Sequence, residues 1–212
     1  MRLALFGLPG AGKGTQAEML SKHFCVPHIS TGDLFREMLS SNTDLGREVK
    51  EIVTSGRLVS DDLVTRIAFN RLSFTDCKNG FILDGYPRTL VQANSLLCSD
   101  YMISHLVLIE VIESEIIKRL SGRRLCQKCN IIFHISNLVD VDRKYFCSQC
   151  QGVLVQRPDD QRAVIETRLK LFNENMSEVF DFFEQKKLMV RVNGDKAPKD
   201  VFRDILDALQ KA

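Results

Sequence analysis

The stretch LALFGLPGAGKGT, residues 3–15, decides how this chain folds. Its first four residues are apolar and predict a buried strand, and the glycine-rich run from Gly7 predicts a loop that leads into a helix. In such a loop the backbone N–H groups turn toward one anion, Lys13 adds a positive charge, and the helix presents the positive end of its dipole. The sequence therefore predicts a nucleoside-triphosphate site. Gly14 stands where the general pattern has Ser or Thr, which follows only at Thr15.

Composition excludes several classes of protein. The chain has 212 residues, of which 44% are hydrophobic, so it can fill a sizeable core. Its 29 Lys and Arg nearly balance 27 Asp and Glu, so bulk charge gives no argument for binding nucleic acid or membranes. The apolar start ends at Gly7, too soon for an export signal, and the run 103–112 contains His105 and Glu110. We expect a cytoplasmic protein that works without nucleic acid or membrane.

Four of the seven cysteines have the spacing of a metal site. Cys126 and Cys129 form one Cys-x-x-Cys pair, and Cys147 and Cys150 form a second. The thiolates of two such pairs can converge on one divalent ion, which predicts structural zinc, with iron or two redox dithiols as the alternatives. Four protein ligands leave no open position for substrate, so the metal is expected to be architectural. We expect the other cysteines to be small buried apolar residues: Cys25, Cys77 and Cys98.

Strand-like apolar runs alternate with helical patterns along the chain. This alternation predicts an α/β protein, a P-loop three-layer fold with a five-stranded parallel sheet between helices. The expected strands cover residues 3–6, 26–30, 80–84, 104–110 and 188–193. The expected helices cover 13–23, 31–41, 43–55, 62–72 with Ser60 as N-cap, 89–97, 113–120, 160–187 and 198–209.

Two stretches interrupt the alternation and are expected to be inserts. Residues 30–59 place helices between two strands without adding a strand, and residues 122–160 contain the cysteine pairs. The remaining segments, 1–29, 60–121 and 161–212, would form the core domain with the phosphate loop.

A set of arginines and one aspartate suggest what the loop serves. Any single arginine can be explained by an ion pair, but together with a phosphate loop the set is better explained as forks for several phosphates: Arg36, Arg88, Arg119, Arg123, Arg157 and Arg168. Arg119 and Arg123 are expected on one helix face, where like charges repel. Asp84 ends an expected strand, and we favour a magnesium-holding role through water over a general base or a plain cap.

These motifs resemble those of the adenylate kinases, a nucleoside monophosphate kinase family, in the long-lid bacterial form with a four-cysteine zinc lid. The resemblance covers essentially the whole chain and rests on the loop from Gly7, on Ile29-Ser30-Thr31-Gly32-Asp33, and on Leu83-Asp84-Gly85-Tyr86-Pro87-Arg88-Thr89 with Gln92. Gly122-Arg123-Arg124 and Asp159-Asp160 add support. It implies a monomer that converts ATP and AMP into two ADP with magnesium, closing both inserts over the nucleotides.

The resemblance also implies residue roles. It assigns catalysis to Lys13, Asp84, Arg88, Arg123, Arg157 and Arg168. It assigns ATP to Gly10, Ala11, Gly12, Lys13, Gly14, Thr15, Arg119, Arg123, Ile132, Phe133 and the Lys196 backbone. It assigns AMP to Thr31, Arg36, Arg57, Leu58, Val59, Gly85, Tyr86, Pro87, Arg88, Gln92, Arg157 and Arg168, with the Gln92 amide reading adenine.

The chain also departs from the family's usual pattern. The stretch from His134 to Leu138 replaces an Asn-Pro-Pro turn that many relatives have, and His134 is a weaker candidate metal ligand than the cysteines. Two alternatives stay open: a kinase for UMP, CMP or another monophosphate, or one that uses GTP, and a zinc-ribbon P-loop protein that binds nucleic acid. The few aromatic residues of the ribbon and the lack of a basic stripe elsewhere disfavour the second alternative.

Overall fold

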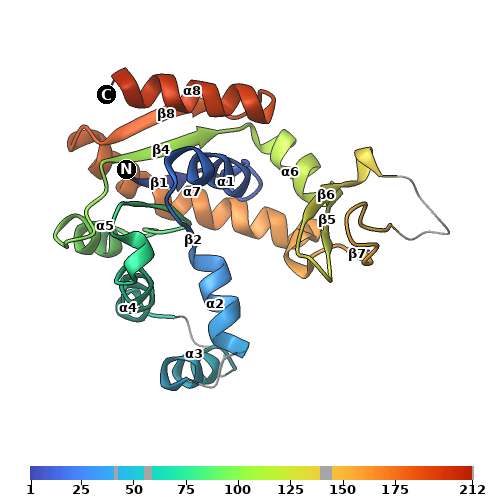
Figure 1. The fold of residues 1–212 in the computed structure, drawn as a ribbon, viewed down its shortest axis with the longest axis horizontal. Coiled ribbons are helices and arrows are strands. Elements are labelled where there is room, and N and C mark those ends of the chain that lie inside the picture. Colours follow the sequence, from blue (N-terminus) through green and yellow to red (C-terminus); the bar gives the residue numbers. More distant parts are fainter. Residues whose placement is uncertain (41–42, 55–58, 139–144, 212) are drawn as a thin grey trace. The chain divides into compact units, whose positions relative to one another are not determined.

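The structure, a computed structural model, describes residues 1–40, 43–54, 59–138 and 145–211 (Figure 1). The chain divides into two units. The first contains Met1–Gly7, Gly12–Glu110 and Glu174–Ala212, and the second contains Leu8–Ala11 and Val111–Asn173. Whether residues 30–59 and 122–160 act as inserts, as the sequence predicts, is not decided by this division and stays a prediction.

The first unit is built on a parallel sheet. Within the described residues it has five strands in the order β2-β3-β1-β4-β8, and every neighbouring pair is parallel. The strands are β1 (Arg2–Phe6), β2 (His28–Ser30), β3 (Phe81–Asp84), β4 (His105–Glu110) and β8 (Met189–Asn193). The predicted five-stranded parallel sheet is confirmed.

The central strands are buried on both faces. Consecutive residues of β1 from Leu3 to Leu5, and of β4 from Leu106 to Val107, have no exposed surface. Because side chains of a strand alternate between faces, such continuous burial requires helices on both sides of the sheet. The helices of this unit are α1 (Lys13–Phe24), α2 (Thr31–Ser40), α3 (Asp44–Thr54), α4 (Asp61–Leu72), α5 (Leu90–Leu97) and α8 (Pro198–Lys211), with the end of α7 (Arg162–Gln185).

Aromatic contacts show how the helices pack on the first unit's sheet. The rings of His23 in α1 and Phe202 in α8 meet at 5.6 Å, and those helices lie side by side. The ring of Phe180 in α7 meets that of Phe6 in β1 at 5.9 Å, edge to face. Short 3-10 turns, Thr75–Cys77, Ile135–Asn137 and Pro158–Asp160, complete the regular structure of the two units.

The second unit combines a helix with a small antiparallel sheet. Helix α6 (Glu113–Gly122) runs directly into β5 (Arg123–Cys126), which pairs with β6 (Ile132–His134) on one side and β7 (Leu154–Val155) on the other. The start of α7 belongs to the same unit. We call the segment from Arg123 to Val155 the ribbon.

Several local predictions are confirmed and three are wrong. Ser60 caps α4 by accepting a hydrogen bond from the Leu63 N–H at 3.3 Å. Arg123 lies in β5, so it does not share a helix face with Arg119, because α6 ends at Gly122 and pairing with β6 takes over. The long helix begins at Arg162 and not at 160, since the residues before it form a 3-10 turn. Two cysteines expected to be buried are exposed, Cys25 and Cys98, while Cys77 is buried as expected.

No helix in the described part of the chain is both long enough and apolar enough to cross a membrane.

Candidate functional site

The glycine-rich loop lies between β1 and α1, as its sequence predicts. The Lys13 side chain turns back along the loop, and its Nζ donates to the Gly7 carbonyl oxygen at 2.8 Å. Gly10 has a φ of 87°, and a Cβ there would lie 2.8 Å from Leu120 Cγ, so no other residue fits this place. The first turn of α1 carries no acidic side chain, which leaves the positive helix end available to an anion.

Asp84 lies at the end of the strand next to β1. Its Cα is in register with that of Leu5, and its Oδ2 lies 3.8 Å from where a Cβ of Gly14 would be. The Nε2 atom of His28, on β2, is 3.6 Å from the same carboxylate oxygen. Strand pairing thus brings a carboxylate against the first turn of α1. The sequence analysis missed His28, because only the register of β2 on β3 places it beside Asp84.

The segment that follows Asp84 is tied together by side chains that the sequence assigns to AMP. Thr31 Oγ1 donates to the carbonyl oxygens of Gly85 at 3.0 Å and Asp84 at 3.3 Å. Arg88 Nε donates to the Gly85 carbonyl at 2.8 Å, and the Arg88 N–H donates to Gln92 Oε1 at 2.7 Å. Thr31, Gly85, Arg88 and Gln92 are therefore brought together by direct hydrogen bonds.

The Gln92 amide has a second partner that the sequence analysis missed. Gln92 is buried, and its Nε2 donates to Asp61 Oδ1 at 2.7 Å, while Thr89 Oγ1 donates to the other oxygen of Asp61 at 2.9 Å. Asp61 and Thr89 look like ordinary residues at helix starts, so no sequence signal distinguished Asp61. In this structure the Gln92 amide organises the loop, and its reading of adenine stays a prediction.

Tyr86 packs inside the first unit. Its side chain is fully buried, its hydroxyl donates to Thr65 Oγ1 at 3.1 Å, and burial raises its pKa. The Tyr86–Pro87 peptide bond is cis. A contact of Tyr86 with a nucleotide would therefore use its backbone.

Four more residues assigned to AMP lie at or near the gaps in the described chain. Arg36 lies in α2, but its side chain is outside the described residues. Arg57 and Leu58 also lie outside the described residues, and Val59 is half-buried before α4.

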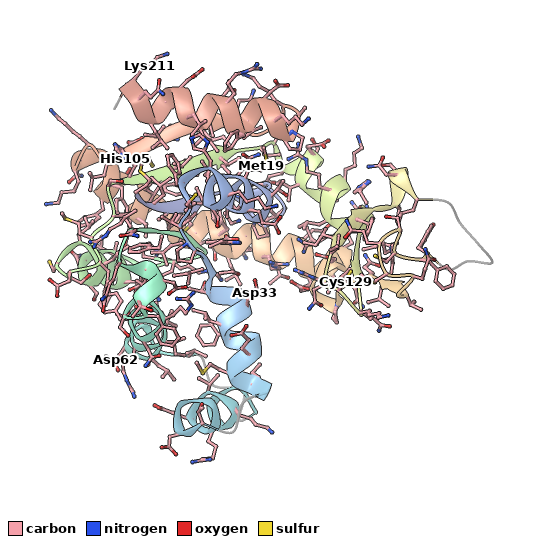
Figure 2. All side chains as sticks on the ribbon, in the orientation of Figure 1. Met19, Asp33, Asp62, His105, Cys129 and Lys211 are labelled. Atoms are coloured by element: carbon pink, nitrogen blue, oxygen red, sulfur yellow. The ribbon has the colours of Figure 1, made fainter. Side chains whose placement is uncertain are left out.

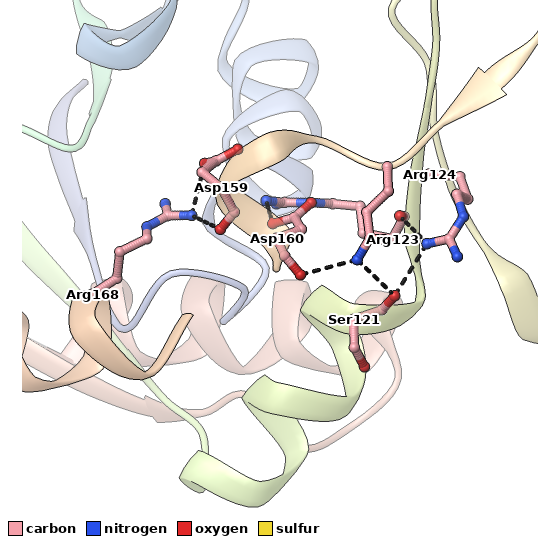
Figure 3. Close-up of polar contacts among 7 residues, drawn as sticks. Ser121, Arg123, Arg124, Asp159, Asp160 and Arg168 are labelled. Atoms are coloured by element: carbon pink, nitrogen blue, oxygen red, sulfur yellow. Dashed lines mark hydrogen bonds and ion pairs between the residues drawn. The ribbon is translucent and has the colours of Figure 1, made fainter. Parts of the chain in front are cut away.

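Three of the assigned arginines of the second unit pair with carboxylates, and Figure 3 shows two of them, Arg123 and Arg168. Arg123 Nε and Nη2 donate to the two carboxylate oxygens of Asp160 at 2.7 and 2.5 Å, and Asp160 is completely buried. Arg168 Nη1 donates to Asp159 Oδ2 at 2.7 Å and to its carbonyl oxygen at 3.1 Å. Arg119 Nε donates to Glu115 at 3.0 Å. The aspartates stand out in sequence only as a family motif, because the pairing of Asp160 with Arg123 joins residues far apart in the sequence.

Arg157 precedes the 3-10 turn that carries those aspartates. Three other residues are assigned to ATP, and each lies in a different environment. Ile132 is 53% exposed on β6, Phe133 packs against the cysteine cluster, and Lys196 lies in the loop before α8, where its Nζ donates to Asp204 at 2.6 Å.

The four cysteines of the ribbon converge, and their ligand atoms all lie within 4.8 Å of one another (Figure 2 labels Cys129). The Sγ atoms of Cys126 and Cys150 are 3.4 Å apart, and those of Cys129 and Cys147 are 3.6 Å apart. Zinc–sulfur bonds of about 2.3 Å place tetrahedral sulfurs about 3.8 Å apart. The cluster therefore fits one tetrahedral metal ion.

The two halves of this cluster have the same local structure. The N–H of Lys128 donates to Cys126 Sγ, and the N–H of Gln149 donates to Cys147 Sγ, both at 3.4 Å. Although burial opposes it, backbone N–H groups near Cys126 lower the pKa of that thiol to about 6, whereas burial and neighbouring thiols raise the pKa of Cys129 and of Cys150. A lowered pKa favours the thiolate, which is the form that binds metal. His134 does not join the cluster, since its ring nitrogens contact Ser136 and the carbonyl of Lys118.

Comparison with known proteins identifies the family. The family model described as adenylate kinase matches residues 5–188. An adenylate kinase of Caldicellulosiruptor bescii is 42% identical over 216 residues, covering 99% of each chain. Those of Acetivibrio thermocellus and Treponema denticola are 42% and 43% identical, covering 99% and 95% of this chain and 98% and 95% of their own. With a matching family model over most of its length and relatives above 40% identity end to end, this chain belongs to the adenylate kinase family.

Proposed function

We propose that this protein reversibly transfers the γ-phosphoryl group of ATP to AMP, giving two ADP, in the presence of magnesium. Family membership supports the reaction class, and the observation that carries the proposal is the position of Asp84 against the first turn of α1 at Gly14, the residue after Lys13. A strand-end carboxylate beside a glycine-rich phosphate loop is the arrangement that phosphoryl transfer needs.

Lys13 and the start of α1 would bind the ATP phosphates. Lys13 now donates to a carbonyl of its own loop, and this contact would be exchanged for phosphate oxygens. Gly12, Gly14 and Thr15 would contribute backbone N–H groups at the positive helix end, as would Gly10 and Ala11 from the loop. Lys13 and these N–H groups would stabilise the negative charge of the transferring phosphoryl group without forming a covalent bond to it.

Asp84 would hold magnesium through water, with Thr15 as a second candidate. Carboxylate oxygens and water are the ligands that magnesium prefers, and the Asp84 carboxylate faces Gly14. When bound, the ion would neutralise phosphate charge. A general base is not needed, because the accepting phosphate oxygen of AMP is already anionic.

The guanidinium group of Arg123 is oriented so that it can bind a phosphate. Asp160 binds its Nε and Nη2, and among the described residues no carboxylate contacts Nη1. A buried carboxylate thus fixes the guanidinium plane and leaves an edge for phosphoryl oxygens. Arg119, Arg157 and Arg168 would add charge, with Arg168 released from the half-exposed Asp159.

AMP would be bound by the segment around Gly85. Thr31 and Arg88 already hydrogen-bond to the Gly85 carbonyl, so the loop is organised before a nucleotide arrives. The Arg88 guanidinium would bind the AMP phosphate, and Gln92 and the backbone of Tyr86, Pro87 and Val59 would lie around the base. These residues would select adenine over a smaller pyrimidine base once the Gln92 amide turns toward the base.

The cysteine cluster would hold zinc as a structural ion. Four thiolates complete a tetrahedron, so the ion has no position for substrate or water. The chemistry of reduced thiols also supports a cytoplasmic location. We further propose a monomer, which size-exclusion chromatography with and without nucleotides would check.

A coupled assay that offers ATP or GTP as donor, and AMP, UMP, CMP or GMP as acceptor, tests the proposed function. We expect ATP with AMP to give the highest kcat/KM, and no turnover without magnesium. Equal or faster turnover of UMP or CMP would contradict AMP as the acceptor. Salt-sensitive binding of oligonucleotides without kinase activity would instead favour a nucleic-acid-binding protein.

A further inference from the structure

Side chains from β5, from β6 and from Gln156, the residue that follows the ribbon, contact the carbonyl end of α6. From β5, Arg124 Nη1 donates to the Ser121 carbonyl at 3.1 Å. From β6, His134 Nε2 lies 3.4 Å from the Lys118 carbonyl. From the residue after β7, Gln156 Nε2 reaches the Ser121 carbonyl at 3.4 Å. The last carbonyls of a helix, including that of Ser121, have no partner within the helix, so Arg124 and Gln156 form its cap, and His134 contacts the turn before it.

Arg124 is the member of this cap with charge. Its Nη1 also donates to the Arg123 carbonyl at 2.7 Å, so one nitrogen binds the carbonyls of Ser121 and Arg123, which flank Gly122 at the end of the helix (Figure 3). The Tyr145 ring lies 6.0 Å from the guanidinium carbon. A cation is favourable at the negative end of the helix dipole. Arg124 is therefore placed where it fixes the backbone on both sides of Gly122.

The cap is connected to the partner of Arg123. Gln156 Nε2, which reaches the Ser121 carbonyl, also donates to the Asp160 carbonyl at 3.0 Å. The Asp160 carboxylate in turn binds the Arg123 guanidinium. Arg124, which also binds the Arg123 carbonyl, and Gln156, which also binds the Asp160 carbonyl, thus donate to one acceptor, the Ser121 carbonyl.

Packing at Gly122 leaves the chain little freedom to change direction there. A Cβ on Gly122 would lie 2.1 Å from His134 Nε2 and 2.6 Å from its Cε1, so the imidazole occupies the space of a side chain. Gly122 is buried, and Arg123 and His134 are paired across β5 and β6. The packing of His134 on Gly122 and the pairing of β5 with β6 therefore both constrain the direction in which the chain leaves α6.

We propose that Arg124 is a positioning residue for ATP binding: by capping the carbonyl end of α6 it sets the direction in which Arg123 leaves the helix. This inference rests on the proposed function, in which Arg123 binds the phosphates of ATP. A cap that served stability alone would change the melting temperature and would not distinguish ATP from AMP.

The test compares Arg124→Gln and Arg124→Lys with Arg162→Gln, which removes an exposed arginine that pairs with Glu166. We expect Arg124→Gln to raise the Kd for magnesium–ATP about tenfold, in a calorimetric titration without AMP, and to raise the KM for ATP equally. The KM for AMP and the zinc content should match those of Arg162→Gln, while loss of the cap should lower the melting temperature slightly. Arg124→Lys should recover most of the affinity, since an ammonium can donate to both carbonyls.

Two results would overturn the proposal. One is an ATP affinity of Arg124→Gln equal to that of Arg162→Gln, and the other is a parallel loss of ATP and AMP affinity together with a lower melting temperature. If Arg124→Gln does not fold, Gln156→Leu cuts the link between Ser121 and Asp160, and an unchanged Kd for ATP in that variant would refute the proposal. Because the titration omits AMP, an unmodified protein that binds ATP but does not transfer phosphate would count against the proposed function alone.

Discussion

The parallel sheet of the first unit and the ribbon of the second are stabilised internally by different interactions. Strands β1 and β4 bury consecutive Leu, Ala and Val side chains completely. The buried cluster of the ribbon contains Cys126, Cys147 and Leu154, so most of it is thiol. Apolar burial contributes about 25 cal/mol per Å², which stabilises the sheet but not so small a ribbon. The sheet is therefore stabilised by its core, and we expect the ribbon to need the proposed zinc ion.

Metal removal should separate the two regions most strongly. Structural zinc contributes about 10–16 kcal/mol of apparent binding free energy, so a chelator should unfold the ribbon before the sheet. We expect a lower-temperature transition to appear in calorimetry, and protection from hydrogen exchange to be lost in β5–β7 but kept in β1 and β4. Cys126→Ser should do the same, and Cys98→Ser, at an exposed cysteine outside the cluster, should not. A melting temperature unchanged by zinc removal would show that the ribbon does not need the ion.

Lys13→Met should break the chemistry and leave both regions folded. Loss of one donor to the developing charge costs about 10²- to 10³-fold in kcat. Its melting temperature and zinc content should stay close to those of the unmodified protein. Lys22→Met is the matched control, because Lys22 is an exposed lysine of the same helix, α1. Comparable steady-state rates for the two variants would exclude Lys13 from the site.

Leu106→Ala should damage the sheet without loosening the metal. Leu106 is completely buried in β4, and a large-to-small change at such a place costs about 2–5 kcal/mol. Urea unfolding should show the loss, whereas the zinc content should not change. Leu171→Ala removes the same atoms from a side chain that is 52% exposed, and it should cost far less. Equal losses in the two variants would contradict the comparison.

Ser60→Ala tests a smaller, local feature of the first unit. The Ser60 hydroxyl caps α4, and removal of such a cap costs about 1 kcal/mol. Thermal unfolding should show this loss, and the affinity for zinc should not respond. Ser95→Ala is a suitable control, since Ser95 lies inside α5 and its hydroxyl only donates to the Val91 carbonyl. A Ser60→Ala variant as stable as this control would mean that the cap is not needed.

The sequence predicted the features that depend on neighbouring residues. Buried strands, helix starts and the two cysteine pairs all follow from local patterns, which explains why the sheet and the convergence of the four cysteines are confirmed. Thr89, predicted as the first residue of a helix, is the N-cap of α5, one residue earlier than the helix itself. Such a shift changes nothing in the site.

The errors and omissions arise where long-range pairing overrides local spacing. Arg119 and Arg123 have helical spacing, but β5 begins at Arg123 and turns it toward Asp160. Similarly, His28 meets Asp84 only through strand register. The cap on α6 also joins residues from separate strands of the ribbon. The sequence therefore identified the arginines of the site but not the carboxylates and carbonyl groups that orient them.

Transfer from γ-labelled ATP tests the central claim most directly. The protein is incubated with magnesium, AMP and ATP that carries ³²P in its γ-phosphate, and the position of the label is followed by chromatography. We predict that the label leaves ATP and appears in the β-phosphate of ADP at early times, while AMP is consumed in an equal amount. Label released as inorganic phosphate, or label that stays in ATP while AMP is unchanged, would contradict the account.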